Sequence, residues 1–155
     1  GKEMLIETQK HLPVDIAVCS AAVSDYVTIN YSKKKMKKKQ NENLNFKKNK
    51  DILEFLAKNN FQRPKLVVGF SAETEKLIEH SIQKKDNKNC DWIVGNDISN
   101  KKIGFNSDFN SVSIINHKNE IENIEKNSKK YIANIISKRI MDHFAKKNIH
   151  GKSIN

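Results

Sequence analysis

A carboxylate and a lysine that could take part in binding or catalysis follow the first apolar run of the chain. Asp25 lies in the segment 21–26 (AAVSDY), directly after the apolar residues that begin at Val14, and Lys35 comes ten residues later. An open α/β sheet binds ligands at the carboxyl ends of its strands, where small residues and a carboxylate would then meet the ligand. The lysines that include Lys35 suit a polyanion, so this stretch predicts an anionic ligand.

The positive charge of the chain is concentrated around Lys35. The formal net charge is +11, and lysines occupy positions 33, 34, 35, 37, 38 and 39, followed by 47, 48 and 50. Such a run can bind phosphate groups, but it can equally form a solvated loop. In both cases we expect some non-specific affinity for nucleic acid.

Length and composition limit the class of protein. A chain of 155 residues is long enough for one domain that buries roughly two-thirds of its unfolded surface. It has no apolar stretch of the roughly 18 residues that span a bilayer, and the start at Gly1 has no signal-peptide pattern. We therefore predict a cytoplasmic protein without membrane contact.

Cysteine and histidine predict neither a disulfide framework nor a zinc site. The chain has two cysteines, Cys19 and Cys90, without partners at metal-ligand spacing, and we expect buried thiols. The five histidines do not cluster with acidic residues or cysteine, which also excludes a catalytic triad.

Apolar periodicity predicts alternating elements that could position Asp25 and the lysines. We expect a helix over residues 2–12, a strand over 14–23, a helix capped by Asp51, a strand over 65–70, a helix over 74–85 and a strand over 91–95. Residues 44–46 alternate between apolar and polar, which is a weak strand signal. This order is typical of a parallel sheet with crossover helices.

The last third of the chain has a different pattern. Residues 111–115 and 121–124 flank a short polar turn and predict a β-hairpin, and Ser128 can cap a final helix that ends before Gly151. We therefore predict one α/β domain over residues 1–155, a Rossmann-like, mostly parallel sheet with crossover helices, closed by a β-hairpin and a helix. Since such sheets normally begin with a strand and this chain begins with a helix, we expect the domain to lack its first strand.

Six short segments occur in the order found in one enzyme family. They are residues 21–26 (AAVSDY), 35–38 (KMKK), 68–74 (VGFSAET), 84–88 (KKDNK), 96–97 (ND) and 104–108 (GFNSD). The chain resembles the phosphopantothenoylcysteine synthetase domain of the bifunctional synthetase/decarboxylase family of coenzyme A biosynthesis. The resemblance covers residues 4 to 145. The family's amino-terminal strand and Gly-rich loop have no counterpart, so we expect this chain alone to be inactive.

The resemblance implies a CTP-dependent ligase that joins 4′-phosphopantothenate to cysteine through an acyl-cytidylate. It implies Mg²⁺ as the cofactor and CTP as a co-substrate, and no FMN on this chain, because flavin belongs to the decarboxylase domain to which the family is usually fused. It also implies a homodimer and no specific nucleic acid partner.

The resemblance assigns roles to individual residues but names no metal ligands. Lys35 matches a mobile lysine loop that closes over the reacting centre and is the expected catalytic residue, while Asp25 matches a nucleotide-site carboxylate. The other expected nucleotide-binding residues are Lys50, Asp51, Ile52 and Leu53 at a helix start, Phe70 at a strand end, and Lys84 and Lys88. Lysine at position 50 replaces the family's proline. Each residue also has a structural alternative, such as a cap for Asp51 or core packing for Phe70.

Two other functions compete with the ligase. A basic nucleic-acid-binding module would explain the charge, but the lysine run lacks the interleaved aromatic residues of single-strand binders. A dinucleotide-dependent oxidoreductase would need a Gly-x-Gly-x-x-Gly segment after a strand, and the sequence has none. Selective stabilisation by CTP would distinguish the ligase from both.

Overall fold

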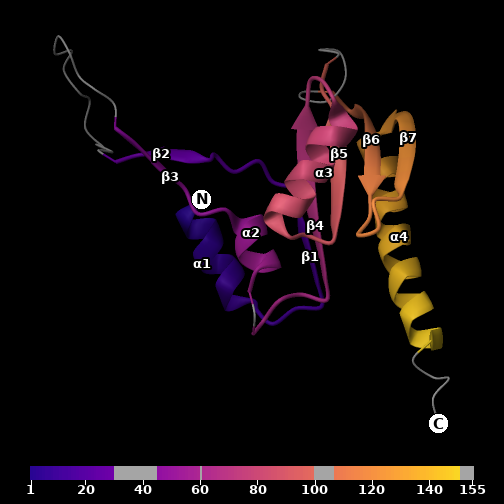
Figure 1. The fold of residues 1–155 in the computed structure, drawn as a ribbon, viewed down its shortest axis with the longest axis horizontal. Helices are drawn as coiled ribbons and strands as arrows, with labels where there is room; N and C mark the ends of the chain where they lie inside the picture. Colours follow the sequence, from indigo (N-terminus) through magenta and orange to yellow (C-terminus); the bar gives the residue numbers. More distant parts are fainter. Residues whose placement is uncertain (30–44, 60, 100–106, 151–155) are drawn as a thin grey trace.

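The computed structural model describes residues 1–29, 45–59, 61–99 and 107–150, the last four of these by their backbone only. Its main sheet has five strands in the order β1-β4-β5-β6-β7 (Figure 1). Strands β1 (Ile16–Cys19), β4 (Leu66–Glu73) and β5 (Trp92–Asp97) are parallel. Strands β6 (Phe109–Ile115) and β7 (Ile121–Ser128) form the antiparallel hairpin that extends the sheet. The predicted α/β fold class is confirmed.

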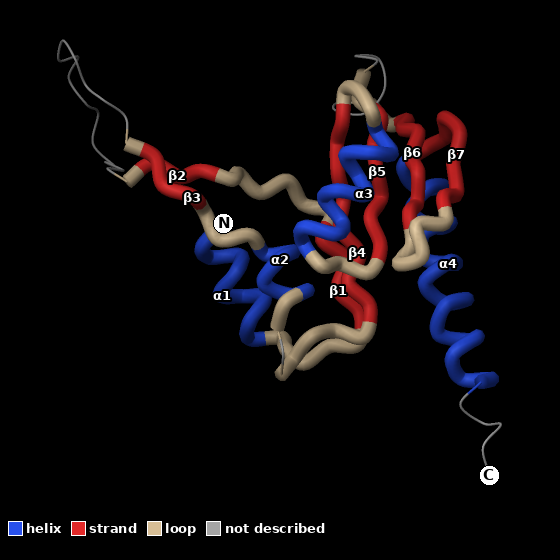
Figure 2. The backbone as a smooth tube through the Cα atoms, viewed as in Figure 1, coloured by secondary structure: helices blue, strands red, loops and turns tan. Residues whose placement is uncertain are grey.

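Helices cover both faces of the central strands (Figure 2). On one face, α1 (Lys2–Lys10), α2 (Ile52–Ala57) and α3 (Leu77–Lys88) pack over a cluster that includes Val67 and Ile93. On the other face, α4 (Lys129–His150) packs over a cluster that includes Val68 and Val94. Successive residues of a strand point to opposite faces, so the continuous apolar runs of β4 and β5 can supply both clusters.

Among the described residues, no helix has the length and apolarity that a bilayer span requires.

The strand predicted over residues 14–23 is wrong in its extent. β1 ends at Cys19, and the small residues Ser20, Ala21 and Ala22 are exposed, because they carry no large apolar side chain to bury against the helices. The chain then enters a separate two-stranded ribbon, β2 (Tyr26–Thr28) paired with β3 (Phe46–Lys48), which projects away from the main sheet (Figure 1).

The predicted helix after β4 is shifted along the chain. β4 continues through Glu73, because residues 71–73 pair with 95–97 of β5, so the helix cannot begin at residue 74 or before, and it begins at Leu77. It runs three residues beyond the predicted end at Lys85 and stops at Asn89, whose φ of 58° is left-handed. The predicted caps are confirmed: Asp51 accepts a hydrogen bond from Glu54 N, and Ser128 accepts one from Tyr131 N.

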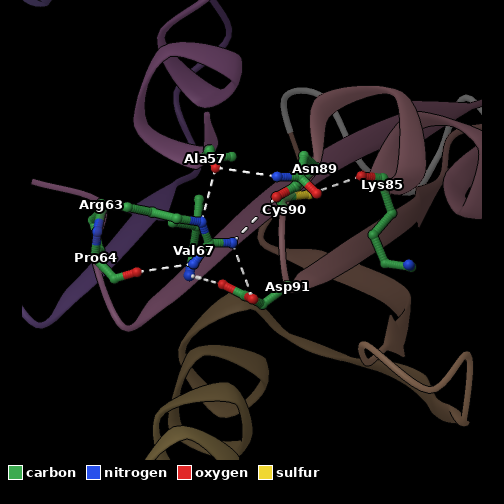
Figure 3. A network of polar contacts seen from close by, with 8 residues as sticks. All are labelled: Ala57, Arg63, Pro64, Val67, Lys85, Asn89, Cys90 and Asp91. Atoms are coloured by element: carbon green, nitrogen blue, oxygen red, sulfur yellow. Dashed lines mark hydrogen bonds and ion pairs between the residues drawn. The ribbon is translucent and has the colours of Figure 1, made fainter. Parts of the chain in front are cut away.

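Arg63 and Asp91 form a network of polar contacts at the amino ends of β4 and β5 (Figure 3). The Arg63 guanidinium donates to the carbonyl oxygens of Ala57 and Asn89 and to Asp91 Oδ1, at 2.8, 3.2 and 3.1 Å. The second Asp91 oxygen accepts the Val67 N–H at 2.7 Å. The Arg63–Asp91 pair thus connects both strands with the end of α2.

We expect Asp91→Ala to destabilise the protein by about 2 kcal/mol, because it leaves the buried Val67 N–H without an acceptor and Arg63 without its counter-ion. Urea unfolding followed by circular dichroism measures the change. Asp15→Ala is the matched control, since it removes the Asp15–Lys65 pair in which both side chains are 70% exposed, and should cost less than about 1 kcal/mol. Equal urea midpoints for the two variants would contradict the stabilising role that we give to Asp91.

Candidate functional site

The loop after β1 and the start of α2 are joined by Asn49. Its backbone N–H donates to the Asp25 carbonyl oxygen at 2.7 Å, and its side-chain amide donates to the Ser24 carbonyl oxygen at 3.0 Å. Two predicted nucleotide-binding segments that lie about 25 residues apart in sequence are therefore adjacent in the fold. Asn49 itself was not among the predicted binding residues, although it opens the NKDI segment in which three of them lie.

Asp51 and Lys88 form an ion pair between the start of α2 and the end of α3. Lys88 Nζ lies 2.9 Å from Asp51 Oδ2 and 3.2 Å from Glu54 Oε2. The other oxygen of Asp51 caps α2 by accepting the Glu54 N–H at 2.9 Å. The structure thus brings together two predicted site residues and adds Glu54, which the sequence patterns did not single out.

The ion pair shifts the pKa values of its members. Burial raises the pKa of Asp51, but the hydrogen bond from Glu54 N and the contact with the Lys88 ammonium outweigh burial, so its pKa lies below the usual range. The contact with Asp51 raises the pKa of Lys88, with a further contribution from Glu54. Both side chains are consequently charged at neutral pH.

The start of α2 is already occupied by its own cap. Asp51 accepts the N–H that a phosphate would otherwise use, so a phosphate at this helix start must bind beside the Asp51 carboxylate or displace it. Ile52 and Leu53 are buried in the core, and they could offer a ligand only their backbone groups.

Gly69 allows α2 to approach β4 closely. A Cβ atom at this position would lie 2.6 Å from Leu53 Cδ2, closer than side-chain packing permits. Gly69 is paired with Cys19 of β1, the last residue before the loop that carries Asp25. The glycine of the VGFSAET segment therefore helps to set the position of the helix that begins after Asp51.

The remaining predicted site residues are more dispersed. Phe70 packs with the cluster under α4, on the face opposite the one that carries α2 and Lys88. Lys84 is half-buried one turn before Lys88, and Asp25 is exposed; neither side chain has a hydrogen bond or ion pair with another residue that the structure describes. Lys35 lies outside the described residues.

An open pocket borders the Asp51–Lys88 pair. It has a volume of about 530 Å³ and is lined by Asn49, Lys50, Asp51, Glu54, Phe55, Lys58 and Asn59. This volume lies within the range of small-molecule sites, but the walls of such sites are mostly apolar, whereas Phe55 is the one apolar residue among the described residues that line this pocket. The pocket gives Lys50 and Asp51 a shared ligand-accessible surface.

The described residues contain no group of three histidine, cysteine, aspartate or glutamate side chains able to hold a metal ion. Burial raises the pKa of Cys19 and of Cys90 to about 11, so both thiols are protonated at neutral pH and are poor metal ligands. Cys90 is buried as predicted, whereas Cys19 is only half-buried.

The chain matches known proteins over most of its length. The family model of the DNA/pantothenate metabolism flavoprotein C-terminal domain matches residues 1–144. The coenzyme A biosynthesis bifunctional protein CoaBC of Escherichia coli K12 is 40% identical over 104 residues, which are 64% of this chain and 25% of that protein. A cysteine/cysteine sulfinic acid decarboxylase from an unidentified prokaryote is 34% identical over 128 residues, 82% of this chain and 35% of that protein.

Solved structures support the same fold. The crystal structure of the C-terminal domain of a CoaBC protein superposes with a TM-score of 0.73 at 25% identity, covering 94% of this chain and 63% of that chain. The chain spans about a quarter to a third of the length of the curated relatives described above.

We expect Asp51→Asn to lower stability at neutral pH by about 1 kcal/mol, because asparagine keeps a cap but loses the charge paired with Lys88. The folded pKa of Asp51 lies below its ordinary 3.8, so this stabilisation is present above about pH 4 and disappears as the pH falls through the folded pKa. Urea unfolding at pH 7 and near pH 2.5 tests this. The control is Asp142→Asn, which removes a carboxylate that lies 3.7 Å from Arg139 in an exposed ion pair. If the stability difference between Asp51→Asn and wild type is the same at both pH values, the pairing of Asp51 with Lys88 is refuted.

Proposed function

Since this chain belongs to the family of the DNA/pantothenate metabolism flavoprotein C-terminal domain, we propose that it acts in coenzyme A biosynthesis as part of a CTP-dependent ligase. The proposed reaction joins 4′-phosphopantothenate to cysteine. It is supported by the family match over residues 1–144 and by the relatives named for coenzyme A biosynthesis. By analogy with the CoaBC relatives, we also propose a decarboxylase domain as a fused partner, and a homodimer.

The observation that carries this proposal is the meeting of the Asp25 loop, the 49–51 segment and Lys88. A nucleoside triphosphate needs cations for its phosphates and polar groups for its sugar and base. Lys50, Lys84 and Lys88 supply cations from α3 and the residues before α2, and Asp25 supplies an exposed carboxylate after β1. The resemblance adds Lys35 as the catalytic lysine.

The chemistry explains why cations matter here. A carboxylate oxygen of phosphopantothenate attacks the α-phosphorus of CTP, the bond to the β-phosphate oxygen breaks, and pyrophosphate leaves. The cysteine amine then attacks the acyl carbon and releases CMP. Negative charge grows on phosphoryl oxygens in the first step, so fixed ammonium groups lower its barrier by electrostatic stabilisation.

Mg²⁺ fits the donors that the chain offers. This ion is usually held by one or two protein carboxylates together with substrate phosphates, so a cluster of three protein ligands is not needed. Asp25 is the exposed carboxylate next to the 49–51 segment and would hold the ion. Bound there, Mg²⁺ would offset the charge of the triphosphate.

A second candidate function, nucleic-acid binding, is favoured by the β2–β3 ribbon. In its register Tyr26 lies opposite Lys48 and Thr28 opposite Phe46, so both aromatic side chains share one face of the ribbon with Lys48. Tyr26 is 61% and Phe46 is 57% exposed. The pairing thus assembles aromatic and basic groups that are not interleaved in the sequence, a combination that single-strand binders use.

Titration with CTP and Mg²⁺ tests the ligase proposal. We expect Lys88→Ala and Lys84→Ala each to weaken CTP binding by about tenfold or more, since each loses a charge-assisted hydrogen bond to phosphate, and Asp25→Ala to weaken it as well. Lys118→Ala, in the exposed turn of the β6–β7 hairpin, is the control and should bind like wild type.

Isothermal titration calorimetry gives the affinities, with ATP and a single-stranded oligonucleotide as competing ligands. Unchanged CTP affinity in all three variants would remove the site assignment. Oligonucleotide binding that is tighter than CTP binding and falls steeply with salt would favour the second function instead.

A further inference from the structure

Glu54 lines the open pocket together with Lys58, and it contacts both Lys58 and Lys88. Its Oε2 atom lies 3.2 Å from Lys88 Nζ, and its Oε1 atom accepts a hydrogen bond from Lys58 Nζ at 2.7 Å. We propose that Glu54 is a positioning residue that holds Lys88 in place for the phosphate groups of the nucleotide. This inference rests on the proposed function, in which Lys88 contacts the nucleotide.

The two carboxylates that hold Lys88 lie on one face of α2. Asp51 and Glu54 are three residues apart, so both oxygens reach the same ammonium, Asp51 at 2.9 Å and Glu54 at 3.2 Å. The Lys88 side chain is 21% exposed. An ammonium has three N–H groups. With two carboxylates as partners, one N–H remains for a ligand.

Lys58 fixes the orientation of Glu54 in turn. It lies one turn further along the chain and is 49% exposed, and its contact with Oε1 leaves Oε2 directed at Lys88. The hydrogen bond from Lys58, assisted by Lys88, lowers the pKa of Glu54, so the carboxylate is ionised at neutral pH. The result is a chain of contacts from Lys58 through Glu54 to Lys88.

The charges in this cluster nearly cancel. Asp51 and Glu54 offset Lys58 and Lys88, so the four groups together exert little long-range attraction on an anion. Their contribution is geometric: a lysine has a flexible stem, and fixing it before the ligand arrives removes an entropy cost that binding would otherwise include.

Loss of Glu54 therefore has two effects of opposite sign. Removing a negative charge near a phosphate favours anion binding, whereas releasing Lys88 disfavours it. We expect the release to dominate, because the Glu54 side chain is 35% exposed and nearby water weakens its repulsion of a bound phosphate. Glu54→Ala should then raise the Kd for CTP with Mg²⁺ about three- to tenfold.

Two variants separate the effects. Glu54→Gln removes the charge but keeps an oxygen that can accept from Lys88, so its Kd should stay within about twofold of wild type. Glu79→Ala removes a carboxylate from α3 that contacts Lys76 at 3.5 Å, so it reproduces the loss of charge without releasing Lys88. It should bind CTP as tightly as wild type or slightly more tightly. Thermal unfolding verifies that each variant is folded.

A double-mutant cycle tests whether Glu54 acts through Lys88. Glu54→Ala should weaken CTP binding in the wild-type background and have little further effect in a Lys88→Ala background. Equal losses in both backgrounds would show that Glu54 acts elsewhere and would overturn the proposal.

Calorimetry with CTP and Mg²⁺ also distinguishes failure of this inference from failure of the proposed function. CTP binding by wild type with unchanged or tighter binding by Glu54→Ala would refute the positioning role alone. No CTP binding by wild type would refute both.

Discussion

Burial of β4 and β5 on both faces is the constraint on which the rest of this structure depends. Their residues Val67, Val68, Ile93 and Val94 are fully buried and point alternately to the two sides, so each side needs a cover of helices. The chain meets this need by placing α1, α2 and α3 on one face and α4 on the other. The meeting of α2 and α3, and with it the candidate site, is a consequence of that packing.

The site is accordingly an electrostatic contact between helices as much as a binding surface. Lys88 at the end of α3 meets Asp51 and Glu54 at the start of α2, and these contacts exist without any ligand. Under the proposed function, an incoming anion would share Lys88 with these carboxylates, and its affinity would depend on how the lysine is held as well as on total charge. A net charge of +11 is therefore a poor guide to the strength of this site.

The predicted site residues do not all gather at one point, and sheet geometry explains why. Phe70 follows Gly69, and adjacent strand residues face opposite sides, so Phe70 packs toward the α4 side while α2 covers Gly69. The aromatic and basic face of the β2–β3 ribbon was missed because Tyr26 and Lys48 are distant in sequence and become neighbours only through strand pairing.

By itself the sequence determined the order and type of most elements, because apolar periodicity and the caps Asp51 and Ser128 are local signals. Through the family resemblance it also pointed to Asp51 and Lys88 as candidate nucleotide-binding residues, and the structure places these two side chains in contact. Only the tertiary structure decided that β1 ends at Cys19, that β4 runs on to Glu73, and that Glu54 contacts Lys88. Strand ends depend on which neighbour supplies hydrogen bonds, and the Glu54–Lys88 contact joins residues 34 positions apart, so neither has a local signal.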